Sequence, residues 1–495
     1  MSFNSMAFIL FYLVVLLLYF VVPGQRFRWM LLLASSYFFY MWWNPAYIVL
    51  ILFSTLVDYT VGLMMEKSEN QKVRKVFLSM SLLANLGLLF FFKYFSYTYG
   101  LASRLITGNG MDVGFHFLLP MGISFYTFQT LSYSIDVYRK KIKAEHHFGY
   151  FALYVSFFPQ LVAGPIERFD HLMPQLKNKN TFQFDRLHDG LLMMGIGFFK
   201  KIVVADRAAV YVNSVFSQLD TITDGWELIL GLVFFIFQVY GDFSGYSDIA
   251  IGASKIMGID LMTNFRQPFF AEGIRDFWNR WHISLGSWLK DYVYIPLGGN
   301  RISHARTHFN IFVIFAVSGI WHGANLTYWL WGMLHGILHY LDYLWYRFSI
   351  QHKTLNRWCT TCPAYRYVRI TSTFVLVTLS MVLFRSQSLH QAWQYFRKLF
   401  LLSGNRLVSS GALSDRFFSY GLDRVEMSVL LISMMVVLIY DWQLEQHKGL
   451  SGLKNRLLQE PLMLRWSLYF VLIFSIVLFG FYGEMNVQEF IYFQF

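Results

Sequence analysis

Residues 7–22 read AFILFYLVVLLLYFVV and contain no charged side chain. A transmembrane α-helix needs about 20 mainly apolar residues to cross a hydrocarbon core of about 30 Å. The stretch therefore predicts a helix in a bilayer rather than in water. No basic segment precedes it and no small-residue cleavage motif follows it, so we expect a permanent first span and not a removed signal peptide.

Apolar stretches of this kind recur along all 495 residues. They occupy residues 30–43, 46–63, 76–92, 115–135, 150–162, 191–205, 228–240, 309–320, 326–338, 370–384, 427–440 and 466–481. Hydrophobic residues make up 56% of the chain and charged residues 14%, against about 25% charged in soluble domains. This composition excludes a soluble enzyme and a disordered chain. We predict an all-α polytopic membrane protein with about 11 transmembrane helices, the shorter stretches forming re-entrant or amphipathic segments around a central site.

The 41 Lys and Arg residues outnumber the 29 Asp and Glu residues, which gives a net charge of +12. The basic residues lie in short loops rather than in one soluble tail. This distribution is typical of loops whose positive charge sets the orientation of a membrane protein, and it does not indicate a nucleic-acid partner. Even numbers of crossings separate the basic clusters at residues 26–28, 67–75 and 139–143, so the N-terminus is predicted outside. With no internal repeat and no linker, we expect one membrane domain over residues 1–495.

Between residues 241 and 301, charged side chains are mixed with aromatic ones. The segment contains GDFSGYSD at 241–248, RDFWNRWHISL at 275–285 and WLKDYVYIPLGGNR at 288–301. The spacing suits an amphipathic or re-entrant helix with its polar face on an aqueous cavity. An interfacial helix, with a belt of aromatic residues and arginines that reach toward the headgroups, is the alternative that the composition leaves open.

A second feature is His322, which lies in SGIWHGANLTYW at residues 318–329, between two apolar stretches. An ionisable residue at such a position is costly and is a functional candidate by default. The alternative is a neutral imidazole that is hydrogen-bonded inside a helix bundle. Gly319 and Gly323 would allow close approach of a ligand or of another helix.

Metal binding receives little support from the sequence. His335 and His339 have the spacing of two ligands on one helix, but no third ligand is near. Cys359 and Cys362 make half of a structural zinc site at most, and no second pair exists. If residues 322–339 formed one helix, His335 would lie about 220° around the axis from His322. We therefore expect no metal site, and we place these two histidines on different faces.

Several other chemistries lack their motifs. We find no Gly-x-Ser-x-Gly nucleophile elbow, no P-loop and no His-Glu-x-x-His zinc motif. Neither His282 nor His322 is followed five residues later by Asp, so the His-x-x-x-x-Asp pattern of glycerolipid acyltransferases is also absent.

Taken in order, the motifs at residues 275–282, 288–301, 321–325 and 332–336 resemble membrane-bound O-acyltransferases (the MBOAT family). They are most similar to the branch of alginate O-acetylase subunit I, which includes peptidoglycan and cellulose O-acetyltransferase components. The resemblance covers nearly the whole chain, including SSYFFYMWW at 35–43 and FIYFQF at 490–495. It implies an MBOAT-like fold around a central tunnel, with residues 241–341 as the catalytic core region.

The resemblance also implies a reaction in a bacterial cytoplasmic membrane. Acetyl-CoA would be a cytoplasmic donor substrate, with no permanently bound cofactor. The acetyl group would pass through the tunnel to a hydroxyl on the far side. In this branch, an extracytoplasmic partner of the SGNH type usually hands the acetyl group to an exported or cell-wall polysaccharide.

The residues fit such a transfer. A neutral imidazole that takes the hydroxyl proton contributes roughly 10²–10⁴ in rate, and His322 is the expected base. A donor to the oxyanion contributes about 10²–10³, and His282, Asn325 or a neighbouring backbone N–H could supply it. Trp321 is expected to support the site.

Basic side chains are expected to meet the CoA phosphates. The candidates are Arg275, Arg280, Lys290 and Arg301. Asp242 and Asp248 would orient helices or pair with these cations.

Two alternatives remain at this point. The acceptor could be a lipid or a protein hydroxyl with a longer acyl chain, because pocket length is not visible in sequence. The chain could also be a proton-coupled transporter or flippase, which commonly shows a repeat in its two halves.

Overall fold

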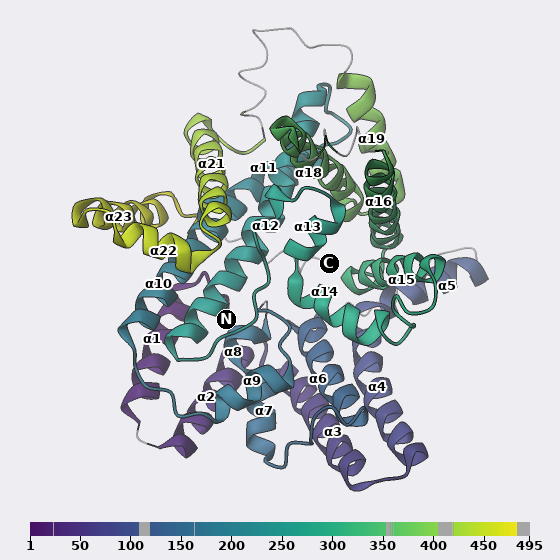
Figure 1. Ribbon diagram of the computed structural model, residues 1–495, viewed down its shortest axis with the longest axis vertical. Coiled ribbons are helices and arrows are strands. Elements are labelled where there is room, and N and C mark those ends of the chain that lie inside the picture. Colours follow the sequence, from purple (N-terminus) through teal and green to yellow (C-terminus); the bar gives the residue numbers. More distant parts are fainter. Residues whose placement is uncertain are drawn as a thin grey trace. The chain divides into compact units, whose positions relative to one another are not determined.

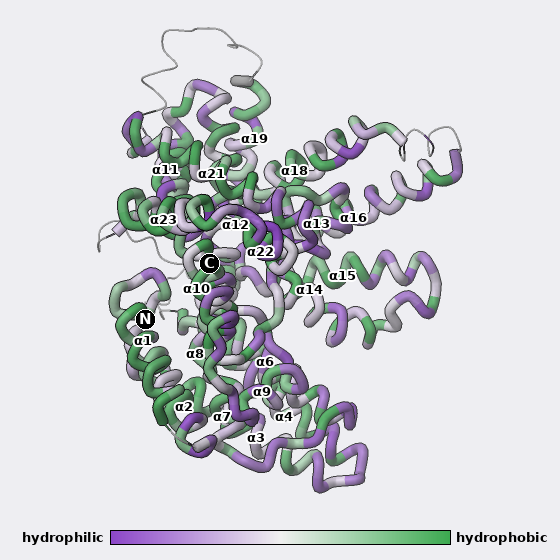
Figure 2. The backbone as a smooth tube through the Cα atoms, turned by 60° about the vertical axis from the view of Figure 1, so that its left-hand side comes forward, coloured by the Kyte–Doolittle hydropathy of each residue, from purple (hydrophilic) through white to green (hydrophobic). Residues whose placement is uncertain are grey.

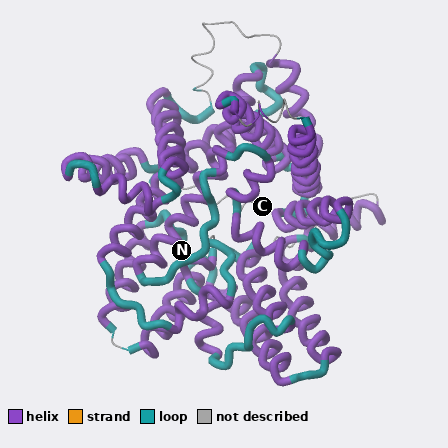
Figure 3. Tube along the Cα trace, viewed as in Figure 1, coloured by secondary structure: helices purple, strands orange, loops and turns teal. Residues whose placement is uncertain are grey.

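The computed structural model describes residues 1–22, 24–107, 119–162, 164–352, 357, 359, 361–403, 418 and 420–482. Helices joined by loops make up this part of the chain, and it contains no strand (Figures 1 and 3). The all-α class predicted from the sequence is confirmed. The FIYFQF segment at 490–495 and the start of the stretch at 115–135 lie outside the described residues.

Among the described residues, six helical segments are long and apolar enough to cross a membrane. They are Pro45–Lys67, Gln71–Lys93, Gly225–Ile256, Pro363–Arg385, Arg424–Gln446 and Leu462–Phe479. The first predicted span forms α1 (Met6–Val21), which has only 16 residues and is coloured mostly as hydrophobic in Figure 2. In α23 (Leu462–Phe479) no residue is buried although its mean hydropathy is 2.1, as expected of a helix that faces lipid. The total of about 11 spans stays a prediction.

The chain divides into two compact units, the first made of Met1–Met194 and Tyr246–Thr263. Its elements besides α1 are α2 (Gln25–Met41), η1 (Pro45–Tyr47), α3 (Ile48–Lys67), α4 (Gln71–Lys93), α5 (Phe95–Thr107), α6 (Ile123–Tyr138), α7 (Phe148–Ser156), α8 (Phe158–Leu161) and α9 (Phe169–Lys177). Two helices, α10 (Phe184–Phe198) and α12 (Gly225–Ile256), contribute to both units.

A buried carboxyl group fastens three helices of the first unit. Asp58 of α3 accepts hydrogen bonds from Ser81 (2.5 Å) and Asn85 (2.8 Å) of α4 and from Ser134 (2.8 Å) of α6. Apolar side chains gain little by leaving lipid for a helix interface, so polar contacts of this kind help to specify which helices pack together.

The second unit, Gly195–Gly245 with Asn264–Phe495, contains the motifs of the sequence analysis. Its remaining elements are η2 (Phe199–Ala205), α11 (Asp206–Ser217), η3 (Pro268–Phe270), α13 (Ile274–Arg280), α14 (Ile283–Leu289), η4 (Lys290–Tyr294), α15 (His304–His322), α16 (Leu326–Gln351), α18 (Pro363–Arg385), α19 (Leu389–Ser403), α21 (Arg424–Gln446) and α22 (Leu450–Leu458). The expectation of one domain over residues 1–495, with a catalytic core at 241–341, stays a prediction.

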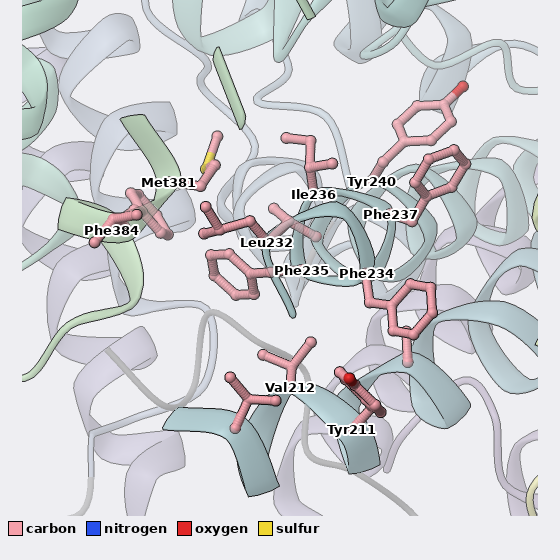
Figure 4. Close-up of a cluster of buried hydrophobic side chains, with 14 of the residues drawn as sticks. Tyr211, Val212, Leu232, Phe234, Phe235, Ile236, Phe237, Tyr240, Met381 and Phe384 are labelled. Atoms are coloured by element: carbon pink, nitrogen blue, oxygen red, sulfur yellow. The ribbon is translucent and has the colours of Figure 1, made fainter. Parts of the chain in front are cut away.

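The core of this unit is built around α12. Its consecutive residues Phe234, Phe235, Ile236 and Phe237 are all buried, and side chains of α11 and α18 pack around them (Figure 4). A helix that is apolar on every side is stable only when it is surrounded, either by protein or by lipid.

A buried ion-pair cluster joins η2, α11 and α12. Lys201 Nζ lies 2.7 Å from Asp206 Oδ1 and 2.7 Å from Asp242 Oδ1. Because all three side chains are almost fully buried, each charge requires the others. Asp242 thus orients helices through Lys201, which is the first of the two roles expected for it.

The offset predicted between His322 and His335 assumed a single helix, but the structure has two helices here, α15 and α16. The chain leaves α15 at Gly323 in an extended conformation and begins α16 after Asn325, which caps it by accepting from Thr327 N. The predicted offset of 220° between His322 and His335 is therefore wrong. The two helices touch through Gly319 and Gly332, where an added Cβ would lie 2.4 Å and 2.3 Å from a backbone oxygen of the facing helix.

Candidate active site

His282 occupies a strained turn between α13 and α14. Its φ of 48° lies in the left-handed region, which non-glycine residues rarely adopt. Two backbone hydrogen bonds hold this turn against the segment that contains Asn264: Ile283 N donates to Asn264 O and Arg266 N donates to Arg280 O, both at 2.9 Å. Strain of this kind persists only where the surroundings impose it, and it concentrates at functional sites.

The side chain of His282 is 2% exposed. Its Nδ1 lies 3.1 Å from Oδ1 of Asn264, and the ring of Phe243 meets it edge to face at 4.6 Å between centroids. Burial lowers the pKa of His282 to about 3. The imidazole is therefore neutral at physiological pH, as a proton acceptor must be.

A cavity of about 410 Å³ lies beside His282. Apolar side chains of α14 and α15, such as Leu285 and Phe315, form much of its wall. The polar groups that also line it are Arg275, Asn279, His282, Ser287, Lys290, Tyr294, Ser318 and His339. A mainly apolar cavity with a few polar groups is typical of a small-molecule site.

His322 ends α15 and is enclosed by aromatic rings. It is 4% exposed, and the rings of Trp321, Trp331 and Phe384 lie 4.9, 5.2 and 5.2 Å from it between centroids. His322 is not among the residues that line the cavity, but Ser318, one helical turn earlier, is.

Two tryptophans connect His322 with the cavity wall. Trp321 contacts both His322 and His282, the latter at 5.9 Å. Trp331 contacts His322 and also Trp278, a lining residue, at 5.7 Å. The structure thus brings the two candidate histidines into one aromatic cluster.

The four candidate cations separate into two groups. Arg275 and Lys290 line the cavity. Arg275 also pairs with Asp342 at 3.3 Å and lies over the ring of Tyr346.

The other two cations do not line this cavity. Arg280 is committed to Asp276 at 2.9 Å and Glu445 at 2.8 Å, and Arg301 is exposed. Only Arg275 and Lys290 are therefore placed to meet a ligand there.

Asn325 has a structural use in this arrangement. Its Oδ1 caps α16, and its Nδ2 donates to the backbone oxygen of Gln387. An amide engaged in this way on both sides is a poor candidate for the oxyanion donor.

Neither the paired histidines nor the cysteines form a metal site among the described residues. Nδ1 of His335 accepts from Trp278 Nε1 at 3.3 Å, and its Nε2 lies 2.9 Å from Ser380 Oγ. His339 lines the cavity, and both cysteines are free thiols. No group of three His, Cys, Asp or Glu side chains that could hold a metal occurs in the described part of the chain.

Sequence reasoning missed two residues that hold the site. Asn264 lies in an NFRQP segment at 264–268 that suggested no chemistry, because its partner His282 is 18 positions away. His335, which the sequence analysis considered as a metal ligand, accepts a hydrogen bond from the indole of the cavity residue Trp278. The two residues of each contact are not spaced as neighbours on one helix or strand are, so the sequence pattern could not predict either contact.

These features define a helical membrane protein with a mainly apolar cavity and a neutral histidine on its wall. The sequence model of the membrane-bound O-acyltransferase family matches residues 137–386. The chain is 38% identical over 406 residues to the probable alginate O-acetylase AlgI of Pseudomonas aeruginosa, covering 81% of this chain and 75% of the relative. It is 33% identical over 420 residues to a peptidoglycan O-acetyltransferase of Helicobacter pylori (79% and 76%) and 29% identical over 288 residues to a teichoic acid D-alanyltransferase of Bacillus subtilis (54% and 69%).

The chain belongs to the membrane-bound O-acyltransferase family and is an O-acyltransferase. The resemblance found in the motifs is confirmed, and the transporter alternative is set aside. The matched segment contains His282 and His322 together with every lining residue of the cavity.

Proposed function

We propose that this protein is an O-acetyltransferase of the bacterial cytoplasmic membrane that uses acetyl-CoA to modify an exported or cell-envelope polysaccharide. The similarity over 406 residues to a protein named alginate O-acetylase carries this proposal. A second relative is named for O-acetylation of peptidoglycan, and a third for D-alanylation of teichoic acid, so each of the three relatives is named for adding an acyl group to a polymer.

The donor would bind from the cytoplasm, with its thioester in the cavity beside His282. Arg275 and Lys290 are the cations proposed to meet the CoA phosphates, because both line that cavity. Hydrogen bonds between such side chains and phosphate oxygens are roughly twice as strong as those between neutral groups. Acetyl-CoA is a substrate in this scheme and not a resident cofactor.

His282 and His322 are the proposed catalytic pair. The reaction needs one group to take the proton of the attacking hydroxyl and another to stabilise the oxyanion that forms on the thioester carbonyl. Support comes from the burial of both imidazoles and from Trp321, which contacts each of them. The role of His322 as the base stays a prediction.

An extracytoplasmic SGNH-type protein is the proposed partner, which would carry the acetyl group from this chain to the polymer. The partner is proposed from the family resemblance alone.

The test is a transfer assay with the purified protein in bilayers. Radiolabelled acetyl-CoA is supplied with and without the SGNH partner, and palmitoyl-CoA serves as the competing donor. We expect acetyl release that depends on the partner or on a soluble hydroxyl acceptor, and no use of palmitoyl-CoA. Preference for the long chain, or no release of CoA from acetyl-CoA under any of these conditions, would contradict the proposal.

A further inference from the structure

Asp342 of α16 connects the cavity residue Arg275 to the helices behind it. The carboxylate is 8% exposed, and its Oδ2 lies 3.3 Å from Nε of Arg275 and 3.3 Å from the backbone N of Arg275. Its Oδ1 accepts from Nη2 of Arg369 at 2.6 Å. One buried carboxylate thus holds two arginines and joins α13, α16 and α18.

Glycine at position 273 leaves the space for this contact. A Cβ added to Gly273 would lie 2.9 Å from both carboxylate oxygens of Asp342 and 2.4 Å from Nη2 of Arg369. The φ of Gly273 is 176°, which any residue adopts, so the position requires space and not backbone freedom. The start of α13 therefore lies directly against the carboxylate.

The guanidinium of Arg275 is held at its Nε and on one face, while its two Nη groups are open. Asp342 and Tyr346 are four residues apart and so lie on the same side of α16. Asp342 binds Nε, and the guanidinium carbon lies 4.8 Å from the centre of the Tyr346 ring. Neither Nη group has a hydrogen bond to a residue that the structure describes, and Arg275 lines the cavity. Four of the five N–H donors of this side chain are therefore available to a ligand.

Arg280 on the same helix shows the opposite arrangement. Its Nε donates to Asp276 at 2.9 Å, and its Nη1 and Nη2 donate to Glu445 at 2.8 and 3.2 Å. This arginine joins helices with both ends of its guanidinium, and it does not line the cavity. The open end of Arg275 is thus not explained by helix packing and indicates a ligand.

The charges around this open end favour an anion. Asp342 contributes one negative charge against the positive charges of Arg275 and Arg369, which leaves a net charge of +1. Lys290, which also lines the cavity, makes no ion pair with a described residue and adds a second positive charge. Because the two Nη groups of an arginine match two oxygens of a phosphate, a phosphate group fits this end of the cavity.

We propose that Asp342 is a positioning residue that holds Nε of Arg275 and so directs its two Nη groups at a phosphate of the CoA donor. The inference rests on the function proposed above and adds to the donor site a residue that does not itself line the cavity. A side chain that is ordered before its ligand arrives loses less rotamer freedom on binding, so the affinity rises. Asp342 acts through Arg275 and not on the acyl group, so the chemistry at the two histidines should not depend on it.

The first test measures binding and needs no acyl transfer. Calorimetry with the purified full chain gives the Kd of CoA and of pantetheine, which has the thiol arm without the phosphates. The proteins are wild type, Arg275→Ala, Asp342→Asn and the double variant.

We expect Asp342→Asn to raise the Kd of CoA about threefold to tenfold, the range for ordering one long side chain, and to leave that of pantetheine within about twofold. The double variant should have the same Kd for CoA as Arg275→Ala alone, because Asp342 acts only through that arginine. An unchanged Kd of CoA in Asp342→Asn would overturn the inference, and so would two effects that multiply in the double variant.

The same measurements separate this inference from the proposed function. A wild type that binds CoA with the expected coupling but does not transfer acetyl would refute the proposed function alone. A wild type that transfers acetyl but shows no coupling between Arg275 and Asp342 would refute the inference alone. A wild type that does not bind CoA would overturn both.

The second test is kinetic. Asp342→Asn should raise the KM for acetyl-CoA about threefold to tenfold, while kcat stays within about twofold. With S-acetylpantetheine as the donor, neither constant should change. If Asp342 only joined helices, its loss would lower kcat with both donors, and that result would overturn the inference.

Asp276→Asn is the matched control. Asp276 also accepts from the Nε of an arginine, Arg280, but neither residue lines the cavity. Its loss should leave the Kd of CoA within about twofold of wild type. A rise as large as that of Asp342→Asn would assign the effect to a weakened α13 and would overturn the inference.

Gly273→Ala replaces Asp342→Asn if that variant does not fold. The added Cβ would displace the carboxylate of Asp342 and the end of Arg369 while every charge stays in place. This variant should also weaken CoA and spare pantetheine. An unchanged Kd of CoA would then overturn the inference.

Discussion

At the scale of single residues, burial and one hydrogen bond decide the chemistry of His282. Desolvation lowers the pKa of its imidazolium to about 3, and Oδ1 of Asn264 lies 3.1 Å from its Nδ1. The sequence indicated His282 as a candidate through its motif. Its charge and its hydrogen-bond partner could not be predicted, because both depend on residues that are distant in sequence.

The depressed pKa predicts that acid destabilises the fold. Unfolded His282 would take a proton below about pH 6.5, whereas the folded imidazole stays neutral down to about pH 3. The free energy of unfolding should therefore fall by about 2 kcal/mol between pH 7 and pH 5 from this group alone. Thermal unfolding of wild type and His282→Asn at both pH values measures it, and an equal pH response of the two proteins would contradict it.

The cation prediction also belongs to single side chains. Arg275→Ala should raise the KM for acetyl-CoA about tenfold, equivalent to about 1.4 kcal/mol of a lost charge-assisted contact, with little change in kcat. Asp342 would keep its contact with Arg369 at 2.6 Å, so the substitution leaves no stranded charge. Arg301→Ala, which removes an exposed arginine outside the cavity lining, is the control. Steady-state kinetics with equal KM values in the two variants would remove Arg275 from the donor site.

At the scale of elements, the break between α15 and α16 places His322. The sequence showed two apolar stretches, at residues 309–320 and 326–338, but the offset predicted between His322 and His335 assumed one helix, whereas the chain turns at residues 323–325. Asparagine is a favoured N-cap because its oxygen accepts an early backbone N–H of the helix. Asn325 could therefore have been predicted to begin a helix, but the sequence analysis considered it only as a donor to the oxyanion. The helices themselves followed from composition, whereas their pairing through Gly319 and Gly332 required the structure.

Close packing of this pair predicts a sensitive glycine. Gly332→Ala would place a Cβ 2.3 Å from the backbone oxygen of Phe315, which no side-chain rotation can relieve. We expect a loss of about 1–3 kcal/mol, as for overpacked cores, together with lower activity because Trp331 and His322 move.

Gly87→Ala provides the comparison for this glycine, because nothing lies within 4 Å of the added Cβ. The melting temperature in detergent should fall for Gly332→Ala only. Equal melting temperatures would show that the contact between α15 and α16 is not tight.

At the scale of the whole molecule, the apolar composition was enough to assign an all-helical membrane protein. The number of spans was not, because six helical segments in the described part of the chain are long and apolar enough to cross a membrane, against about 11 predicted. Helices such as α6 and α7 are buried in protein rather than exposed to lipid, so their polar residues are stabilised by neighbouring helices. The sequence cannot distinguish such helices from spans. The cavity, which draws on α13 to α16, likewise appears only when these helices are folded together.

The most direct measurement of the central claim is the initial rate of CoA release from acetyl-CoA in bilayer-reconstituted protein, for wild type, His282→Ala and His322→Ala. Thermal unfolding first establishes that each variant is folded. If the two imidazoles serve one acyl-transfer site, each variant should lose about 10²-fold or more of the rate. A folded variant of either histidine that releases CoA at the wild-type rate would contradict the account.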